Sequence, residues 1–359
     1  MRNTCIVLYN QRSALDPKRT AGVLNAFLSG GYYFDKLEFL SYDDAGAFKQ
    51  AIAEGKNFSD LLAIICDPPY FSAVRQQLEA CYNTRFSTRT ILDGGAKTAF
   101  LFPCGAEGEQ IVGDEALPFL DKKYRERCAR MVVRAVGVPH ELLSSAVQEA
   151  KSLSGEALNY NISSEYDDFR IEIIYDRNTP KMLVDDVMRV FAVRLAEYIY
   201  ALEDITLAER LHQAIRVRKM NISVAESFTG GGIAKRLVEV PGISGVLQEG
   251  IVSYSNDSKM ERLKVNPYTI RTYGAVSDDT AYEMALGLIN TGKCDLAIAT
   301  TGIAGPKSDS SAKPVGLCYI AIGLKTGIYI YKFIFDGDRK KITETAINHA
   351  LFLAYKQIK

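Results

Sequence analysis

The chain has 359 residues, which is long for a single hydrophobic core, so its length predicts two or three domains. Hydrophobic residues make up 47% and charged residues 24%, a composition that excludes a disordered or fibrous protein. The 43 basic residues balance the 43 acidic ones, which argues against nucleic acid or an anionic membrane surface as the main partner.

No apolar run reaches the length of a membrane span or of a signal-peptide core, so we expect a cytoplasmic protein. The seven cysteines are widely spaced and form no CxxC pair, which indicates thiols rather than a disulfide framework or a zinc site.

The first part of the chain, residues 1–126, alternates short apolar runs with amphipathic stretches. Strands are predicted at 5–9, 61–66 and 99–102, and a helix at 14–28. This alternation is typical of a parallel sheet covered by helices, so we expect an α/β domain here.

The second part, residues 127–202, has a different pattern. We predict a strand at 131–136, a helix at 139–153, a strand at 169–175 and a long helix at 182–200. Pro180 stands where the second helix should begin. These elements indicate a small α+β module.

The third part, residues 203–359, returns to an α/β pattern, and we expect a three-layer α/β/α domain. Helices are predicted at 206–218 and at 340–357, and a third helix should follow the glycine-rich turn and run through residue 238. Strands are predicted at 222–225, 251–254, 296–300, 315–322 and 328–335, where β-branched and aromatic residues gather.

The turn after the strand at 222–225 reads Glu226-Ser227-Phe228-Thr229-Gly230-Gly231-Gly232. Free amides and the positive end of a helix dipole favour an anion at such a turn, and glycine allows close approach. The alternative is an ordinary hydroxyl cap at the start of a helix.

A second glycine-rich loop, Thr300-Thr301-Gly302-Ile303-Ala304-Gly305-Pro306, follows the strand at 296–300. Loops at strand ends are where α/β sheets bind ligands. The backbone amides of Thr301 and Gly302 could face an oxyanion, although a Gly-Pro turn is also common in connecting loops.

Ser227, Tyr254 and Lys259 together contain the groups of an acylating centre. A serine hydroxyl attacks an amide only when a base removes its proton, and a buried lysine can act as that base when its pKa is lowered. Lys259 lies in a segment that Asn256 or Asp257 could cap as a helix. Ser244 is closer to Lys259 in sequence, but Ser227 stands at a strand-to-helix turn and is preferred. A solvated helical lysine is the alternative.

The three histidines are far apart and have no metal-ligand spacing, so no metal site is predicted. Asp338 and Arg339 open the terminal helix, which suggests a helix cap and a phosphate clamp.

These motifs, in this order, resemble the C-terminal domain of the CinA (competence/damage-inducible protein) family, whose members include nicotinamide-mononucleotide deamidases. The resemblance covers about 155 residues. It rests on the segments AESFTGG at 225–231, YSN at 254–256, GAVS at 274–277, TGIAGP at 301–306, KPVG at 313–316 and GDR at 337–339.

The resemblance implies roles for individual residues. Ser227 would be the nucleophile, Tyr254 and Lys259 would handle its proton, and Thr301 with Gly302 would form the oxyanion hole. The substrate-binding residues predicted around them are Glu226, Thr229, Gly230, Gly231, Asn256, Ala304, Gly305 and Arg339. The sequence differs from the family's pattern at Phe228, where cysteine is usual, and at Thr343, where a second arginine is common.

The resemblance extends more faintly upstream. Residues 99–120 look like the end of the family's molybdopterin-binding-like domain, in a degenerate form that lacks its acidic loop. Residues 129–201 resemble the family's KH-like module, without a GxxG loop for nucleic acid.

The resemblance therefore implies an amidohydrolase that converts nicotinamide mononucleotide and water to nicotinate mononucleotide and ammonia. It needs no cofactor, and its partners would be a small nucleotide substrate and further copies of the chain, a dimer by resemblance. Two alternatives stay open: a catalytically silent nucleotide-binding or scaffold protein, and a hydrolase of another anionic amide.

Overall fold

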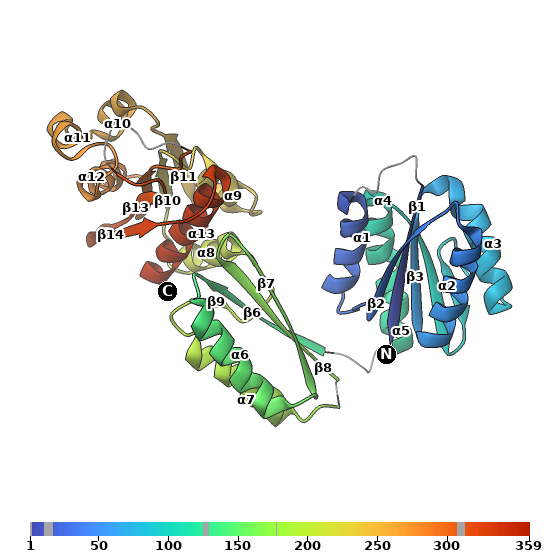
Figure 1. Ribbon diagram of the computed structural model, residues 1–359. Coiled ribbons are helices and arrows are strands. Elements are labelled where there is room, and N and C mark those ends of the chain that lie inside the picture. The colour runs from blue at the N-terminus through green and yellow to red at the C-terminus, as the bar shows by residue number, and fades with distance from the viewer. Residues whose placement is uncertain (1, 11–16, 125–128, 177, 307–312) are drawn as a thin grey trace. The chain divides into compact units, whose positions relative to one another are not determined.

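The structure is a computed structural model that describes residues 2–10, 17–124, 129–176, 178–306 and 313–359 (Figure 1). It divides into two compact units, one made of Met1–Ala129 with Asp176–Asn178 and the other of Arg130–Tyr175 with Thr179–Lys359. The second unit thus holds both the α+β module and the C-terminal domain. Cys128 lies outside the described residues.

The first unit is built on a five-stranded sheet with the order β2-β1-β3-β5-β4, in which β4 alone runs antiparallel to its neighbour. Its elements are β1 (Asn3–Tyr9), α1 (Pro17–Ser29), β2 (Lys36–Ser41), α2 (Ala45–Phe58), β3 (Leu61–Cys66), a 3₁₀ turn (Pro68–Tyr70), α3 (Phe71–Tyr82), β4 (Ile91–Gly94), β5 (Lys97–Pro103), α4 (Ala106–Ile111), a π-helical turn (Val112–Ala116) and α5 (Leu117–Tyr124).

The central strand β3 explains why this sheet needs helices on both sides. Its sequence LLAIIC is apolar at every position, and all six residues are buried. Alternate side chains point to opposite faces, so each face has its own hydrophobic cluster. The predicted strands at 5–9, 61–66 and 99–102 are confirmed, and β2 and β4 were not predicted.

The α+β module has a four-stranded sheet with the order β7-β8-β6-β9. Its elements are β6 (Ala129–Val136), α6 (His140–Ser154), β7 (Leu158–Glu165), β8 (Asp168–Tyr175), α7 (Lys181–Arg194) and β9 (Ile199–Ala201). Strands β7 and β8 form a hairpin, and Tyr166 and Asp167 at its tip have φ angles of 51° and 64°. Paired positive φ values suit the twist of a two-residue hairpin.

One expectation for this module was wrong, and strand β7 was not predicted. The predicted helix at 182–200 ends at Arg194, and the chain then enters the short strand β9. Strand β7 was missed because its sequence LNYNISSE is polar, and most of its side chains are exposed. Helices α6 and α7 cover one face of the sheet, while the opposite face carries charged residues such as Arg134, Asp168 and Arg170.

The C-terminal domain has a five-stranded sheet with the order β11-β10-β12-β13-β14. Its elements are α8 (Leu207–Val217), β10 (Ile222–Glu226), α9 (Gly232–Val238), a 3₁₀ turn (Ile243–Gly245), β11 (Leu247–Val252), α10 (Asn256–Leu263), α11 (Pro267–Tyr273), α12 (Asp278–Ile289), β12 (Leu296–Gly302), β13 (Leu317–Leu324), β14 (Gly327–Ile334) and α13 (Arg339–Ile358).

The sheet of this domain lies between two helical layers. Helices α8, α9 and α13 share one hydrophobic cluster with one face, and the segment from α10 to α12 shares another with the opposite face. Strands β11, β10 and β12 are parallel, so their carboxyl ends meet at one edge. In sheets of this kind that edge is where ligands bind, and Ser227, Tyr254 and Gly302 all lie there.

Candidate active site

Ser227 and Lys259 meet, although 32 positions separate them in sequence. The Lys259 Nζ atom lies 3.0 Å from the Ser227 Oγ atom, and both residues are buried. Ser227 lies just past the carboxyl end of β10. Lys259 lies in the first turns of α10, the helix that follows the neighbouring strand β11. This separation is within reach of direct proton transfer.

The environment of Lys259 makes its amine easier to deprotonate. Only 1% of the residue is exposed, and burial, which penalises the charged ammonium, lowers the pKa of Lys259 to about 8. Its Nζ atom also donates to the main-chain oxygens of Ser253 at 2.8 Å and Tyr254 at 3.2 Å. When neutral, the amine can keep both carbonyl contacts and direct its lone pair at Ser227.

Helix α10 is capped one residue earlier than predicted. The Ser255 side chain accepts a hydrogen bond from the Ser258 amide at 3.1 Å, so Ser255 is the cap rather than Asn256 or Asp257. The side chain of Asn256 is exposed, and the structure gives it no hydrogen bond within the described part of the chain.

Glu226 occupies the position where we expected a bound anion. Its carboxylate is 1% exposed and accepts hydrogen bonds from the amides of Gly231, Ile233 and Ala234 at 2.8–3.0 Å. The Gly230 amide donates to the Ser227 carbonyl at 3.1 Å. The chain's own carbonyl and carboxylate therefore already satisfy the amides of Gly230 and Gly231, which contradicts the prediction that these amides bind the substrate.

Thr229 fastens the same turn to the next strand. Its hydroxyl lies 2.8 Å from the Thr300 hydroxyl, and both side chains are buried. The Ser227 amide donates to the Thr300 carbonyl at 3.1 Å, which adds a main-chain contact. The Thr229 side chain, which was predicted to bind the substrate, is therefore hydrogen-bonded to Thr300 instead.

The backbone amide of Phe228 belongs to the serine turn, and the amide of Gly302 faces that turn. Within the described residues, no acceptor is found for the amide of Phe228, which directly follows the serine. The amide and carbonyl of one strand residue point to the same side, and the sides alternate. Because the Thr300 carbonyl faces β10 and the Ile303 amide faces β13, the Gly302 amide faces the β10 side, next to the serine turn.

Thr301 belongs to the other side of strand β12. By the same alternation its amide faces β13, and its hydroxyl donates to the Ala275 carbonyl at 2.6 Å. Gly302 has no room for a side chain, because a Cβ atom there would lie 2.9 Å from the ring of Phe228. Of the predicted oxyanion pair, the Gly302 amide thus faces the serine turn, whereas the Thr301 amide faces β13. Nothing in the sequence pattern of the loop distinguished Thr301 from its neighbour.

Tyr254 and Arg339 contact each other at the rim of the site. The Arg339 guanidinium donates from Nη2 to the Tyr254 hydroxyl at 3.1 Å and from Nη1 to the Gly305 carbonyl at 2.8 Å. Tyr254 follows β11 by two residues and is 61% exposed. Its hydroxyl is thus directed to Arg339, and only its carbonyl reaches Lys259, which does not match the predicted proton relay.

Ala304 and Gly305 continue β12 into a loop of which residues 307–312 lie outside the described part. Ala304 is 4% exposed and packs with Phe228, so it is almost completely buried. Asp338 caps α13 as predicted, by accepting from the Lys341 amide at 2.8 Å. No group of three or more metal-ligating side chains is found among the described residues.

The family model of the CinA C-terminal domain matches residues 204–358. A competence-damage inducible protein of Caldicellulosiruptor saccharolyticus is 32% identical over 274 residues, covering 75% of this chain and 66% of the relative. One of Clostridium beijerinckii is 36% identical over 258 residues, covering 70% and 62%. The chain belongs to the CinA family.

Solved structures of CinA-family proteins match part of this chain. A competence/damage inducible protein from Agrobacterium tumefaciens is 38% identical, covers 42% of this chain and 94% of its own, and has a TM-score of 0.40. A CinA superfamily protein from Escherichia coli is 30% identical, covers 42% and 88%, and has a TM-score of 0.41. The chain spans less than two thirds of the length of the first two curated CinA-family relatives. None of the described helices is long and apolar enough to cross a membrane.

Proposed function

We propose that the C-terminal domain of this CinA-family chain is a Ser/Lys amidohydrolase that converts nicotinamide mononucleotide and water to nicotinate mononucleotide and ammonia. The observation that carries the proposal is the 3.0 Å contact between Ser227 Oγ and the buried Nζ atom of Lys259. A lysine with a pKa of about 8 is partly neutral near neutral pH, so it can act as a general base there.

In the first half of the proposed reaction, Ser227 Oγ attacks the carboxamide carbon while its proton moves to Lys259. The amides of Phe228 and Gly302 stabilise the oxygen that becomes negative. The ammonium of Lys259 then gives a proton to the amide nitrogen, the C–N bond breaks, and ammonia leaves. The products of this half are an ester on Ser227 and a neutral lysine.

In the second half, water attacks the ester carbon while Lys259 takes its proton. The tetrahedral intermediate collapses, the proton passes to the serine oxygen, and the carboxylate product leaves. The carbonyls of Ser253 and Tyr254 keep the amine aimed at Ser227 through both halves. The proposed reaction uses no redox step and no external cofactor.

The identity of the substrate rests on the resemblance to the nicotinamide-mononucleotide deamidases. Arg339 stands at the rim of the site and already donates to Tyr254 and Gly305. Binding a nucleotide phosphate there would therefore have to compete with these two contacts. A second candidate function, hydrolysis of another amide with an anionic group, shares the same serine, lysine and oxyanion donors.

Ammonia release from nicotinamide mononucleotide tests the proposal. We expect the wild-type chain to be active, and Ser227→Ala and Lys259→Ala each to lower kcat by about 10³-fold or more, because each removes a member of one catalytic unit. Ser244→Ala is the matched control, since it removes the alternative serine, and it should keep the wild-type rate. Equal rates in all four proteins would reject the proposed nucleophile and base.

A panel of amides separates the remaining alternatives. If ammonia is released from other anionic amides and not from nicotinamide mononucleotide, the chemistry stands and the substrate changes. If the mononucleotide binds without any turnover, the catalytically silent nucleotide-binding or scaffold protein is favoured. The number of copies in the assembly stays a prediction, which light scattering of the purified chain can test.

A further inference from the structure

A cavity of about 510 Å³ lies between the α+β module and the C-terminal domain, away from Ser227 and Lys259. Its module side is the charged face of the β6–β8 sheet and the tip of the β7–β8 hairpin. Its other side is formed by α9 and the first turns of α13. All of these elements belong to the same compact unit. The lining is mostly polar, and the site proposed above does not use it.

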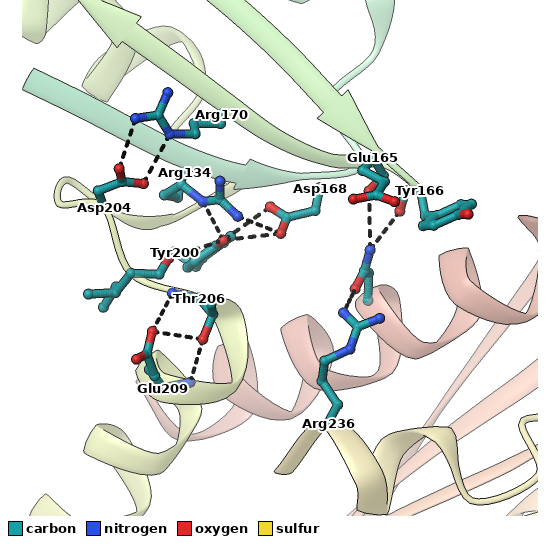
Figure 2. A network of polar contacts seen from close by, with 12 residues as sticks. Arg134, Glu165, Tyr166, Asp168, Arg170, Tyr200, Asp204, Thr206, Glu209 and Arg236 are labelled. Carbon is teal, nitrogen blue, oxygen red and sulfur yellow. Dashed lines mark hydrogen bonds and ion pairs between the residues drawn. The ribbon is translucent and has the colours of Figure 1, made fainter. Parts of the chain in front are cut away.

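Two arginines from different elements are held in place on opposite walls of this cavity. Arg134 on β6 donates to the Tyr200 hydroxyl and to the Asp168 carboxylate, each at 2.7 Å. Figure 2 shows this pair beside Tyr200 and, across the gap, Arg236 of α9. Arg236 donates to the Asn348 side chain at 2.9 Å, and also to a glutamate of α13.

Each of these guanidinium groups has one nitrogen that is not used in the hydrogen bonds above. Within the described residues, the structure gives no acceptor to Nη1 of Arg134 or to Nε of Arg236. Arg170 and Lys340 also line the cavity, and the Lys340 ammonium lies 5.9 Å from the centre of the Tyr166 ring. Four cationic groups, on β6, β8, α9 and α13, therefore border one cavity, together with the carboxylates of Glu165, Asp168 and Glu344.

The Asp168 side chain on the cavity wall is 16% exposed. Burial raises the pKa of the Asp168 carboxyl, even though Arg134 and Arg236 both act to lower it. Because a largely buried wall screens charges weakly, the attraction of an entering anion to the arginines is strengthened there, as is its repulsion by the Asp168 carboxylate. This feature supports the cavity as a binding site, in addition to its shape and its donors.

We propose that this cavity binds a small phosphorylated molecule of about the size of a sugar phosphate. The phosphate oxygens would accept from Arg134, Arg236 and Lys340, which approach from three directions as a phosphate requires. The sugar hydroxyls would meet Ser163, Ser164 and the Glu165 carboxylate, which also line the cavity. The volume falls within the range of small-molecule sites. The proposal is independent of the amidohydrolase reaction.

The chain contains no tryptophan, which allows a reporter specific to this cavity. The variant Tyr166→Trp places the only indole at the hairpin tip, so its fluorescence reports on the cavity and not on the serine site. The probe is ribose 5-phosphate, with ribose as the uncharged control. We expect a saturable change with the phosphate ester and none with ribose.

The charge of the cavity is then reduced in the reporter protein. Arg236→Gln combined with Lys340→Gln should raise the Kd for ribose 5-phosphate by at least about tenfold, because hydrogen bonds from charged groups are lost. The matched control is Arg189→Gln, whose side chain is 72% exposed on α7 and far from the lining, and it should leave the Kd unchanged. An unchanged Kd in the double variant, or an equal response to ribose, overturns the proposal.

A second measurement uses the unmodified chain, in case the tryptophan variant does not fold. Lysine acetylation read by mass spectrometry should show Lys340 protected by ribose 5-phosphate. The exposed Lys332 on β14 serves as the internal reference and should react equally with and without the ligand. Equal labelling of Lys340 in both samples would also overturn the proposal.

Discussion

The protonation state of Lys259 decides whether Ser227 has a base. Because the pKa of Lys259 is about 8 and only the neutral amine can accept the serine proton, kcat/KM should rise with pH and level off above about 8. Initial rates of ammonia release between pH 6 and pH 10 measure this profile. The two ends of this range each lie about two pH units from the pKa of Lys259.

Lys259→Arg tests the same residue without removing its charge. A guanidinium stays protonated over this pH range, so the variant should be inactive and should not recover at high pH. Lys264→Arg, an exposed position at the end of the same helix, is the matched control and should keep the wild-type profile. A flat profile in the wild type would contradict a neutral lysine as the base.

At the scale of elements, α9 depends on a carboxylate from the strand before it. Glu226 accepts three amide hydrogen bonds at the start of this seven-residue helix, which has no side-chain cap of its own. Glu226→Ala should lower the free energy of unfolding by about 2–4 kcal/mol, because one buried and two partly buried amides lose a charged acceptor. Urea unfolding followed by circular dichroism measures the change.

The same substitution should also reduce ammonia release, since Ser227 directly follows Glu226 and the turn would lose its anchor. Glu239→Gln alters an exposed acidic residue at the other end of α9 and should change neither stability nor rate. If Glu226→Ala unfolds at the same urea concentration as this control, the carboxylate does not stabilise the helix.

At the scale of the whole molecule, the second compact unit joins two modules through a shared core. Val136, Tyr200 and Ala201 of the α+β module belong to the same hydrophobic cluster as helices α8 and α13. The Asn348 side chain also donates to the Tyr166 carbonyl at 2.9 Å. A fragment of residues 130–359 should therefore unfold in one transition and keep the ammonia-release rate of the full chain.

A fragment of residues 203–359 provides the comparison. It lacks the module, so it exposes the apolar surface of α8 and α13 and should unfold at a lower urea concentration than fragment 130–359. Equal midpoints for the two fragments would show that the shared cluster adds nothing to the stability of the C-terminal domain.

Several of these features could be predicted from sequence. The buried strands of the two five-stranded sheets, the terminal helix and the Asp338 cap follow from patterns within a few residues, since periodicity and capping are local properties. Strand β7 was not predicted because an exposed polar edge strand has no apolar alternation. The helix that begins at Lys181 was predicted to end too late because the sequence beyond it continues the helical pattern.

The sequence by itself determined the α/β architecture of the third part, the serine at a strand-to-helix turn and a lysine within reach along the chain. Only the tertiary structure decided that Lys259 is buried against Ser227, that Glu226 takes the expected place of an anion, and that Arg339 holds Tyr254. The reason is physical: burial, pKa and hydrogen-bond partners depend on side chains brought together from distant strands and helices, and local patterns carry no record of those distances.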